Sequence, residues 1–96
     1  MIIDPDFLNA SRKITAIYDE KKGMTTINDK LLHIITEVGE LANALRNNEN
    51  LDRVAEELTD VFLTTLALKD KIGISNIDFD MAIREKIIKI KERLSL

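Results

Sequence analysis

Apolar residues recur at intervals of three and four along most of the chain, which is the spacing of amphipathic helices. They fall into four groups, and short polar segments separate the groups. Asp4 and Pro5 precede the first group, and Gly23 ends it. An aspartate cap, a proline in the first turn and a terminal glycine predict a helix between Pro5 and Gly23. Its apolar positions are Phe7, Ala10, Ile14 and Ile17.

Two further apolar stripes flank an asparagine-rich turn. The first follows the turn at 23–26 and stops at 46–48, where asparagines can end one helix or cap the next. The second begins at Leu51 and reaches Gly73, after cations that suit a helix C-terminus. The two stripes consist of Leu31, Ile34, Ile35, Val38, Leu41, Ala42 and Leu45, and of Val54, Ala55, Leu58, Val61, Phe62 and Thr65.

A last helix is predicted from candidate caps at Ser75, Asn76 and Asp78 to the C-terminus. Its stripe consists of Phe79, Ile83, Ile87, Ile90 and Leu94. No strand-like alternation or linker interrupts the pattern, and helices joined by short loops usually pack as antiparallel neighbours. We therefore expect an all-α, four-helix-bundle-like fold in one domain over residues 1–96, with the second and third helices forming a hairpin.

Composition narrows the possible partners and locations. A chain of 96 residues with 45 % hydrophobic but only 4 % aromatic residues builds a modest core, which a second subunit would help to stabilise. We expect a homodimer, with a homotetramer as second choice. A net charge of −3 argues against binding a nucleic acid polymer. The chain has no cysteine, no basic apolar leader after Met1 and no charge-free window for a membrane span, so we expect a cytoplasmic protein.

Acidic residues lie beside the apolar stripes of the predicted hairpin. At about 100° per residue, Glu37 and Glu40 lie roughly 60° apart on one edge of their helix. Glu57 and Asp60 repeat this spacing on the next helix. Folding the hairpin between residues 48 and 49 brings position 37 opposite 60, and 40 opposite 57. One such pair could be ordinary solvated decoration, but two opposed pairs indicate a shared site.

Four converging carboxylates would repel one another unless cations lie between them. Oxygen ligands suit Mg²⁺, with Mn²⁺ as a substitute, and magnesium often binds a few carboxylates together with substrate phosphates. On the last helix, Lys86, Lys89 and Arg93 share one flank and could bind phosphate, or could form a solvated face. His33 lies one turn before Glu37, where it could be a ligand, a neighbour of a ligand, a proton carrier or a structural residue.

The segments Thr36-Glu37-Val38-Gly39-Glu40-Leu41 and Glu56-Glu57-Leu58-Thr59-Asp60 resemble the paired acidic motifs of MazG-type nucleotide pyrophosphohydrolases. The resemblance implies that Glu37, Glu40, Glu57 and Asp60 bind Mg²⁺ and are the catalytic residues. It also implies cleavage of nucleoside triphosphates between the α- and β-phosphates, which could serve to cleanse the nucleotide pool.

Two positions depart from the family pattern. Thr36 stands where the first glutamate of the motif is expected, and Glu56 or a partner subunit could compensate for it. Ile90 stands where related chains often carry asparagine between the basic residues. Two alternatives stay open: a related hydrolase of dUTP or phosphoribosyl-ATP type, and a catalytically silent helical interaction module.

Overall fold

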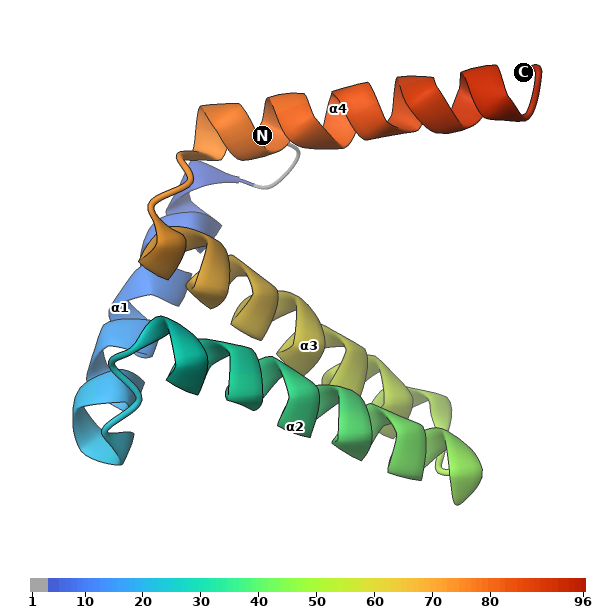
Figure 1. Ribbon diagram of the computed structural model, residues 1–96. Helices are drawn as coiled ribbons and strands as arrows, with labels where there is room; N and C mark the ends of the chain where they lie inside the picture. Colours follow the sequence, from blue (N-terminus) through green and yellow to red (C-terminus); the bar gives the residue numbers. More distant parts are fainter. Residues whose placement is uncertain (1–3) are drawn as a thin grey trace.

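The computed structural model describes residues 4–96, which form four helices and no strand (Figure 1). The helices are α1 (Pro5–Lys22), α2 (Ile27–Arg46), α3 (Leu51–Ile72) and α4 (Asn76–Arg93). The predicted all-α fold is therefore confirmed. None of these helices is both long enough and apolar enough to cross a membrane.

The ends of the helices follow local capping chemistry. Helix α2 begins at Ile27, four residues before the first position of its predicted stripe, because Thr26 and Asp29 form a capping box. The Thr26 hydroxyl accepts from the Asp29 amide at 3.0 Å, and the Asp29 carboxylate accepts from the Thr26 amide at 3.1 Å. Gly23 and Gly73 adopt left-handed φ values of 67° and 97° and end α1 and α3 as predicted.

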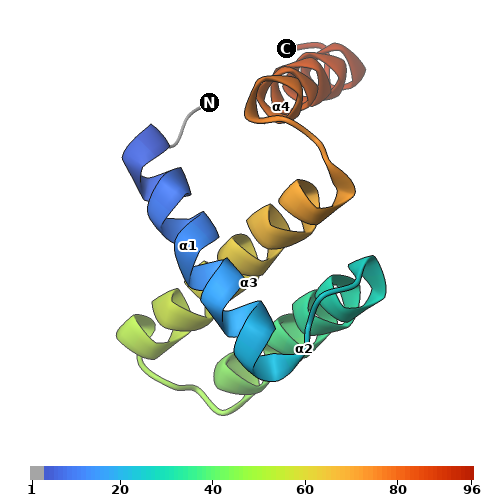
Figure 2. The same ribbon diagram turned by 90° about the vertical axis from the view of Figure 1, so that its left-hand side faces the viewer.

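Helices α2 and α3 form the predicted antiparallel hairpin, and α1 crosses it at one end (Figures 1 and 2). Asn50 caps α3 by accepting from the Arg53 amide at 2.9 Å, so the asparagine turn both ends α2 and starts α3. Among the described residues, the buried hydrophobic side chains are Leu8, Ala44 and Leu66. The hydrophobic core of a single chain is therefore small.

A polar junction, defined as Arg12, Lys69, Asp70 and Asn76, joins α1 to the end of α3 and the start of α4. Arg12 donates to the Asp70 carboxylate at 3.1 and 3.3 Å. The ammonium of Lys69, whose side chain is 3 % exposed, donates to Asp70 at 2.7 Å and to Asn76 at 2.8 Å. Burial opposes ionisation of Asp70, but the hydrogen bonds from Arg12 and Lys69 outweigh it and lower the pKa of this carboxyl.

Helix α4 runs away from the hairpin instead of packing along it (Figure 1). Ser75 is its cap and accepts from the Asp78 amide at 3.0 Å. Much of its apolar stripe is exposed, including Ile87, Ile90 and Leu94. The stripe of α1 is exposed as well, at Ile14 and Ile17. One chain thus leaves much of its predicted apolar surface uncovered.

Candidate metal centre and adjoining cleft

The carboxylate cluster, defined as Glu37, Glu40 and Glu57, lies where α2 and α3 face each other. One carboxylate oxygen from each residue comes within 4.8 Å of the others. The three residues differ in burial: Glu57 is 1 % exposed, Glu37 is half-buried and Glu40 is exposed. The register that the sequence predicted for the hairpin therefore brings together three of the four candidate carboxylates.

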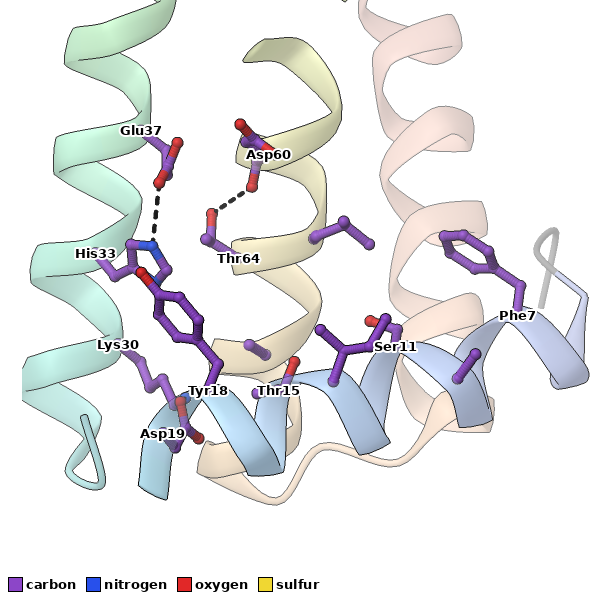
Figure 3. A pocket seen from close by; sticks show the side chains of 14 residues that line it. Phe7, Ser11, Thr15, Tyr18, Asp19, Lys30, His33, Glu37, Asp60 and Thr64 are labelled. Atoms are coloured by element: carbon purple, nitrogen blue, oxygen red, sulfur yellow. Dashed lines mark hydrogen bonds and ion pairs between the residues drawn. The ribbon is translucent and has the colours of Figure 1, made fainter. Parts of the chain in front are cut away.

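Asp60 lies next to the cluster but is not one of its members. It shares with Glu37 one end of a cleft between α1 and the hairpin, and the two side chains come from facing helices (Figure 3). Burial raises the pKa of Glu37, and the negative charges of Glu40 and Asp60 raise it further. Asp60 thus acts electrostatically on the cluster from its cleft side.

Two carboxylate oxygens of the cluster are buried without a hydrogen-bond partner in the described part of the chain, Oε2 of Glu37 and Oε2 of Glu57. Buried polar atoms normally have a partner, and a buried anionic oxygen without one is unfavourable. A divalent cation bound by these carboxylates would supply the positive charge that buried anionic oxygens need. The donor set, which consists of carboxylates without thiolates, fits magnesium or manganese.

The other oxygens of these two residues are held by neighbouring side chains. Nε2 of His33 lies 3.1 Å from Oε1 of Glu37, and the His33 ring is stacked on Tyr18 with centroids 5.5 Å apart and an interplanar angle of 6°. Nη2 of Arg53 lies 2.6 Å from Oε1 of Glu57. Of the roles considered for His33, the structure favours positioning a cluster carboxylate.

Neither Thr36, which stands at the position of the missing motif glutamate, nor Glu56, a candidate to compensate for it, joins the cluster. The Thr36 hydroxyl donates to the carbonyl of Leu32 at 3.0 Å, so it is engaged with its own helix. Glu56 lies on the exposed side of α3 and accepts from Arg53 at 3.2 Å. Within one chain, therefore, neither Thr36 nor Glu56 replaces the missing carboxylate of the motif.

The candidate phosphate-binding residues Lys86, Lys89 and Arg93 are exposed on α4. Because α4 leaves the hairpin, a single chain does not bring them to the carboxylates (Figure 1). Their common flank on one helix was visible in the sequence, whereas the direction of that helix was not.

Sequence reasoning missed the residues that attach α1 beside the cluster. Lys30 is 3 % exposed and pairs with Asp19, which joins α2 to α1 (Figure 3). Its position two turns before Glu37 was the available signal, because residues seven apart share a helix face. Sequence reasoning also missed Arg53, which pairs with Glu57 on α3. Its position one turn before Glu57 is the spacing of a helical ion pair and was the available signal. Nothing in the spacing identified Tyr18.

Comparison with known protein families shows which family most of the chain matches. The model of the MazG nucleotide pyrophosphohydrolase domain matches residues 25–95, which cover α2, α3 and α4 and the whole carboxylate cluster. The chain matches no curated protein and no solved structure closely enough to count as a relative.

Proposed function

The chain belongs to the MazG nucleotide pyrophosphohydrolase domain family, and from that premise we propose that it is a Mg²⁺-dependent enzyme that hydrolyses a nucleoside triphosphate to a nucleoside monophosphate and pyrophosphate. The observation that carries the proposal is the carboxylate cluster, in which two buried oxygens lack a hydrogen-bond partner among the described residues. Manganese is the proposed substitute.

Each acidic residue has a role in this proposal. Glu37, Glu40 and Glu57 hold the metal, and Asp60 completes the ligand set from the side of the cleft. When bound, the metal neutralises phosphate charge and lowers the pKa of water. The water oxygen forms a bond to the α-phosphorus, the bond from that phosphorus to the bridging oxygen breaks, and pyrophosphate leaves. His33 and Arg53 keep Glu37 and Glu57 oriented while the bridging bond breaks.

We further propose that two chains complete the site as a homodimer, with a tetramer as second choice. The outward stripes of the hairpin and of α4 are both apolar and both exposed, so a second copy can cover them. The exposed residues of these stripes include Leu31, Ile35, Val38, Leu58, Phe62, Ile87, Ile90 and Leu94. In this arrangement the partner's α4 supplies the cationic flank of Lys86, Lys89 and Arg93 to the phosphates.

Residues 1–96 act as one domain in this proposal. The family match begins at residue 25, but α1 is attached to the matched part by the ion pairs of Asp19 with Lys30 and of Arg12 with Asp70.

Release of pyrophosphate from a panel of canonical and damaged nucleoside triphosphates, with and without Mg²⁺, tests the proposed reaction. The Glu40→Gln variant removes one ligand charge, and Glu20→Gln makes the same change at an exposed position on α1. We expect Mg²⁺-dependent release in the natural protein and in Glu20→Gln, and a loss of at least about 100-fold in Glu40→Gln.

The panel also includes dUTP and phosphoribosyl-ATP. The compound that is cleaved fastest then distinguishes a broad pyrophosphohydrolase from an enzyme of the dUTP or phosphoribosyl-ATP type. If the natural protein released pyrophosphate from no compound in the panel, this result would contradict the proposed reaction and favour the interaction module. Undiminished release in Glu40→Gln would contradict the assigned metal site.

A further inference from the structure

The cleft between α1 and the hairpin, here called the α1 cleft, extends from the carboxylates along α1 (Figure 3). Its volume is about 390 Å³. Pockets for small molecules typically measure about 300–1,000 Å³ and combine apolar walls with a few polar groups. Here Phe7, Ile14 and Leu63 supply apolar surface, while Glu37 and Asp60 stand at one end. The cleft is therefore large enough for a nucleoside whose phosphates point to the carboxylates.

The two walls of the α1 cleft differ in origin. The wall formed by α2 and α3 lies within the residues that match the family and carries the acidic motifs. The wall formed by α1 (Pro5–Lys22) lies outside the match, which begins at residue 25. In the proposed function, the acidic motifs on α2 and α3 bind the metal, and the metal binds the phosphates. The surface of α1 is therefore available to bind another part of the substrate.

Side chains on the α1 wall suit a nucleobase. Ser11, Thr15 and Tyr18 follow one another at intervals of four and three, so they form one stripe along the cleft. The two hydroxyls have no hydrogen-bond partner among residues 4–96 and can donate to or accept from a base edge. Tyr18 is 41 % exposed although one face of its ring is stacked on His33. A base can extend this stack, since every base offers a flat aromatic face.

The stripe is also fixed relative to the carboxylates. Tyr18 is stacked on His33, and His33 in turn lies 3.1 Å from a Glu37 oxygen. The next residue, Asp19, pairs with buried Lys30 and holds this end of α1 against α2. The aromatic surface and the acidic site are therefore connected by two successive side-chain contacts.

We propose that the α1 cleft binds the nucleoside of the substrate, with the base stacked on Tyr18 and its polar edge bound by Ser11 and Thr15. This inference rests on the proposed function, because it assigns the specificity of that same site. Tyr18, Ser11 and Thr15 are specificity residues, and α1 determines which nucleoside triphosphates are hydrolysed.

The test begins with binding, which does not depend on turnover. Tyr18 is the only tyrosine, so 3-fluorotyrosine gives the protein a single ¹⁹F resonance that reports this ring. The probes are the four common nucleosides and inorganic tripolyphosphate, each titrated without Mg²⁺. We expect a saturable shift with at least one nucleoside and not with tripolyphosphate, and we expect Thr15→Phe, which fills the cleft, to abolish it. Absence of a shift with every nucleoside, or an equal shift in Thr15→Phe, would overturn the inference.

Kinetics then separate the inference from the proposed function. Tyr18→Leu removes the ring, Tyr18→Phe retains it, and Ile17→Leu is a control on the same helix at a residue that does not line the cleft. Tyr18→Leu should raise KM by about 10-fold with a smaller change in kcat and should alter the ranking of bases, whereas Tyr18→Phe should restore both. Turnover with unchanged KM and ranking in Tyr18→Leu would overturn the inference alone. A natural protein that binds nucleosides but cleaves no triphosphate would overturn only the proposed function.

Discussion

At the polar junction, Asp70 receives hydrogen bonds from Arg12 and Lys69, whereas in the carboxylate cluster Glu37 and Glu57 each keep a buried oxygen without a partner in the described structure. The pKa of Asp70 is lowered, although burial opposes this, while burial and neighbouring anions raise the pKa of Glu37. The same fold can therefore neutralise a carboxylate fully where α1, α3 and α4 meet. The carboxylates of the cluster are only partly neutralised by the chain, which indicates a place for a cation that is not part of the chain.

The largest effect should come from Asp60→Asn, which removes a charge on the cluster side of α3. We expect turnover to fall at least about 100-fold, because a metal ligand contributes several kcal/mol to stabilising the transition state. The helical content measured by circular dichroism should stay the same, since Asp60 is exposed. Turnover within a factor of two of the natural protein would show that Asp60 is not a ligand.

Asp70→Asn makes the same substitution at the polar junction and should have the opposite profile. It leaves the buried ammonium of Lys69 without its anionic partner. We expect a loss of about 2 kcal/mol in the free energy of unfolding, measured by urea denaturation, with turnover retained at temperatures where the protein stays folded. If Asp70→Asn had an unchanged free energy of unfolding but lost turnover, Asp70 would have a catalytic role and the contrast between the two regions would be wrong.

The smallest effect concerns the pH dependence of stability in metal-free protein. Because the pKa of Glu37 is raised in the folded state, its charge destabilises the fold above that pKa, and the cost disappears as pH falls toward the ordinary value of about 4.3. Glu37→Gln should therefore be more stable than the natural protein at pH 7, and the difference should shrink on acidification.

For Asp70 the sign is reversed. Its lowered pKa contributes stability above the ordinary value of about 3.9, and this contribution is lost as pH falls through the folded-state pKa. Denaturation of Glu37→Gln and Asp70→Asn across a pH series should give difference curves of opposite sign. Two curves of the same sign would contradict the contrast.

The parts of the molecule that the sequence predicts are those governed by local rules. Caps such as Ser75 and terminal glycines such as Gly73 act within a few residues, so the helices could be placed from periodicity and capping chemistry. The short turn near Asn48 fixes the hairpin register, which is why Glu37, Glu40 and Glu57 come together as spacing suggested.

The remaining features depend on contacts between distant segments. Arg12 and Asp70 are 58 positions apart, and no periodic pattern marks a single ion pair of that kind. At the start of α4, the Asn76 side chain accepts hydrogen bonds from Arg12 and Lys69, whereas the cap is Ser75. The α1 cleft arises from this same long-range packing, so neither its volume nor the place of Tyr18 could be derived from helical spacing.

Binding of a divalent cation by the carboxylate cluster is tested most directly by thermal unfolding in a Mg²⁺ titration at constant ionic strength. The natural protein and Glu57→Gln are compared, because Glu57 is buried and one of its carboxylate oxygens has no hydrogen-bond partner among residues 4–96. A ligand that binds only the folded state raises the melting temperature with concentration. We predict such a rise for the natural protein and little or none for Glu57→Gln. Equal rises in both proteins, or no rise in either, would contradict the assignment of this cluster as a metal site.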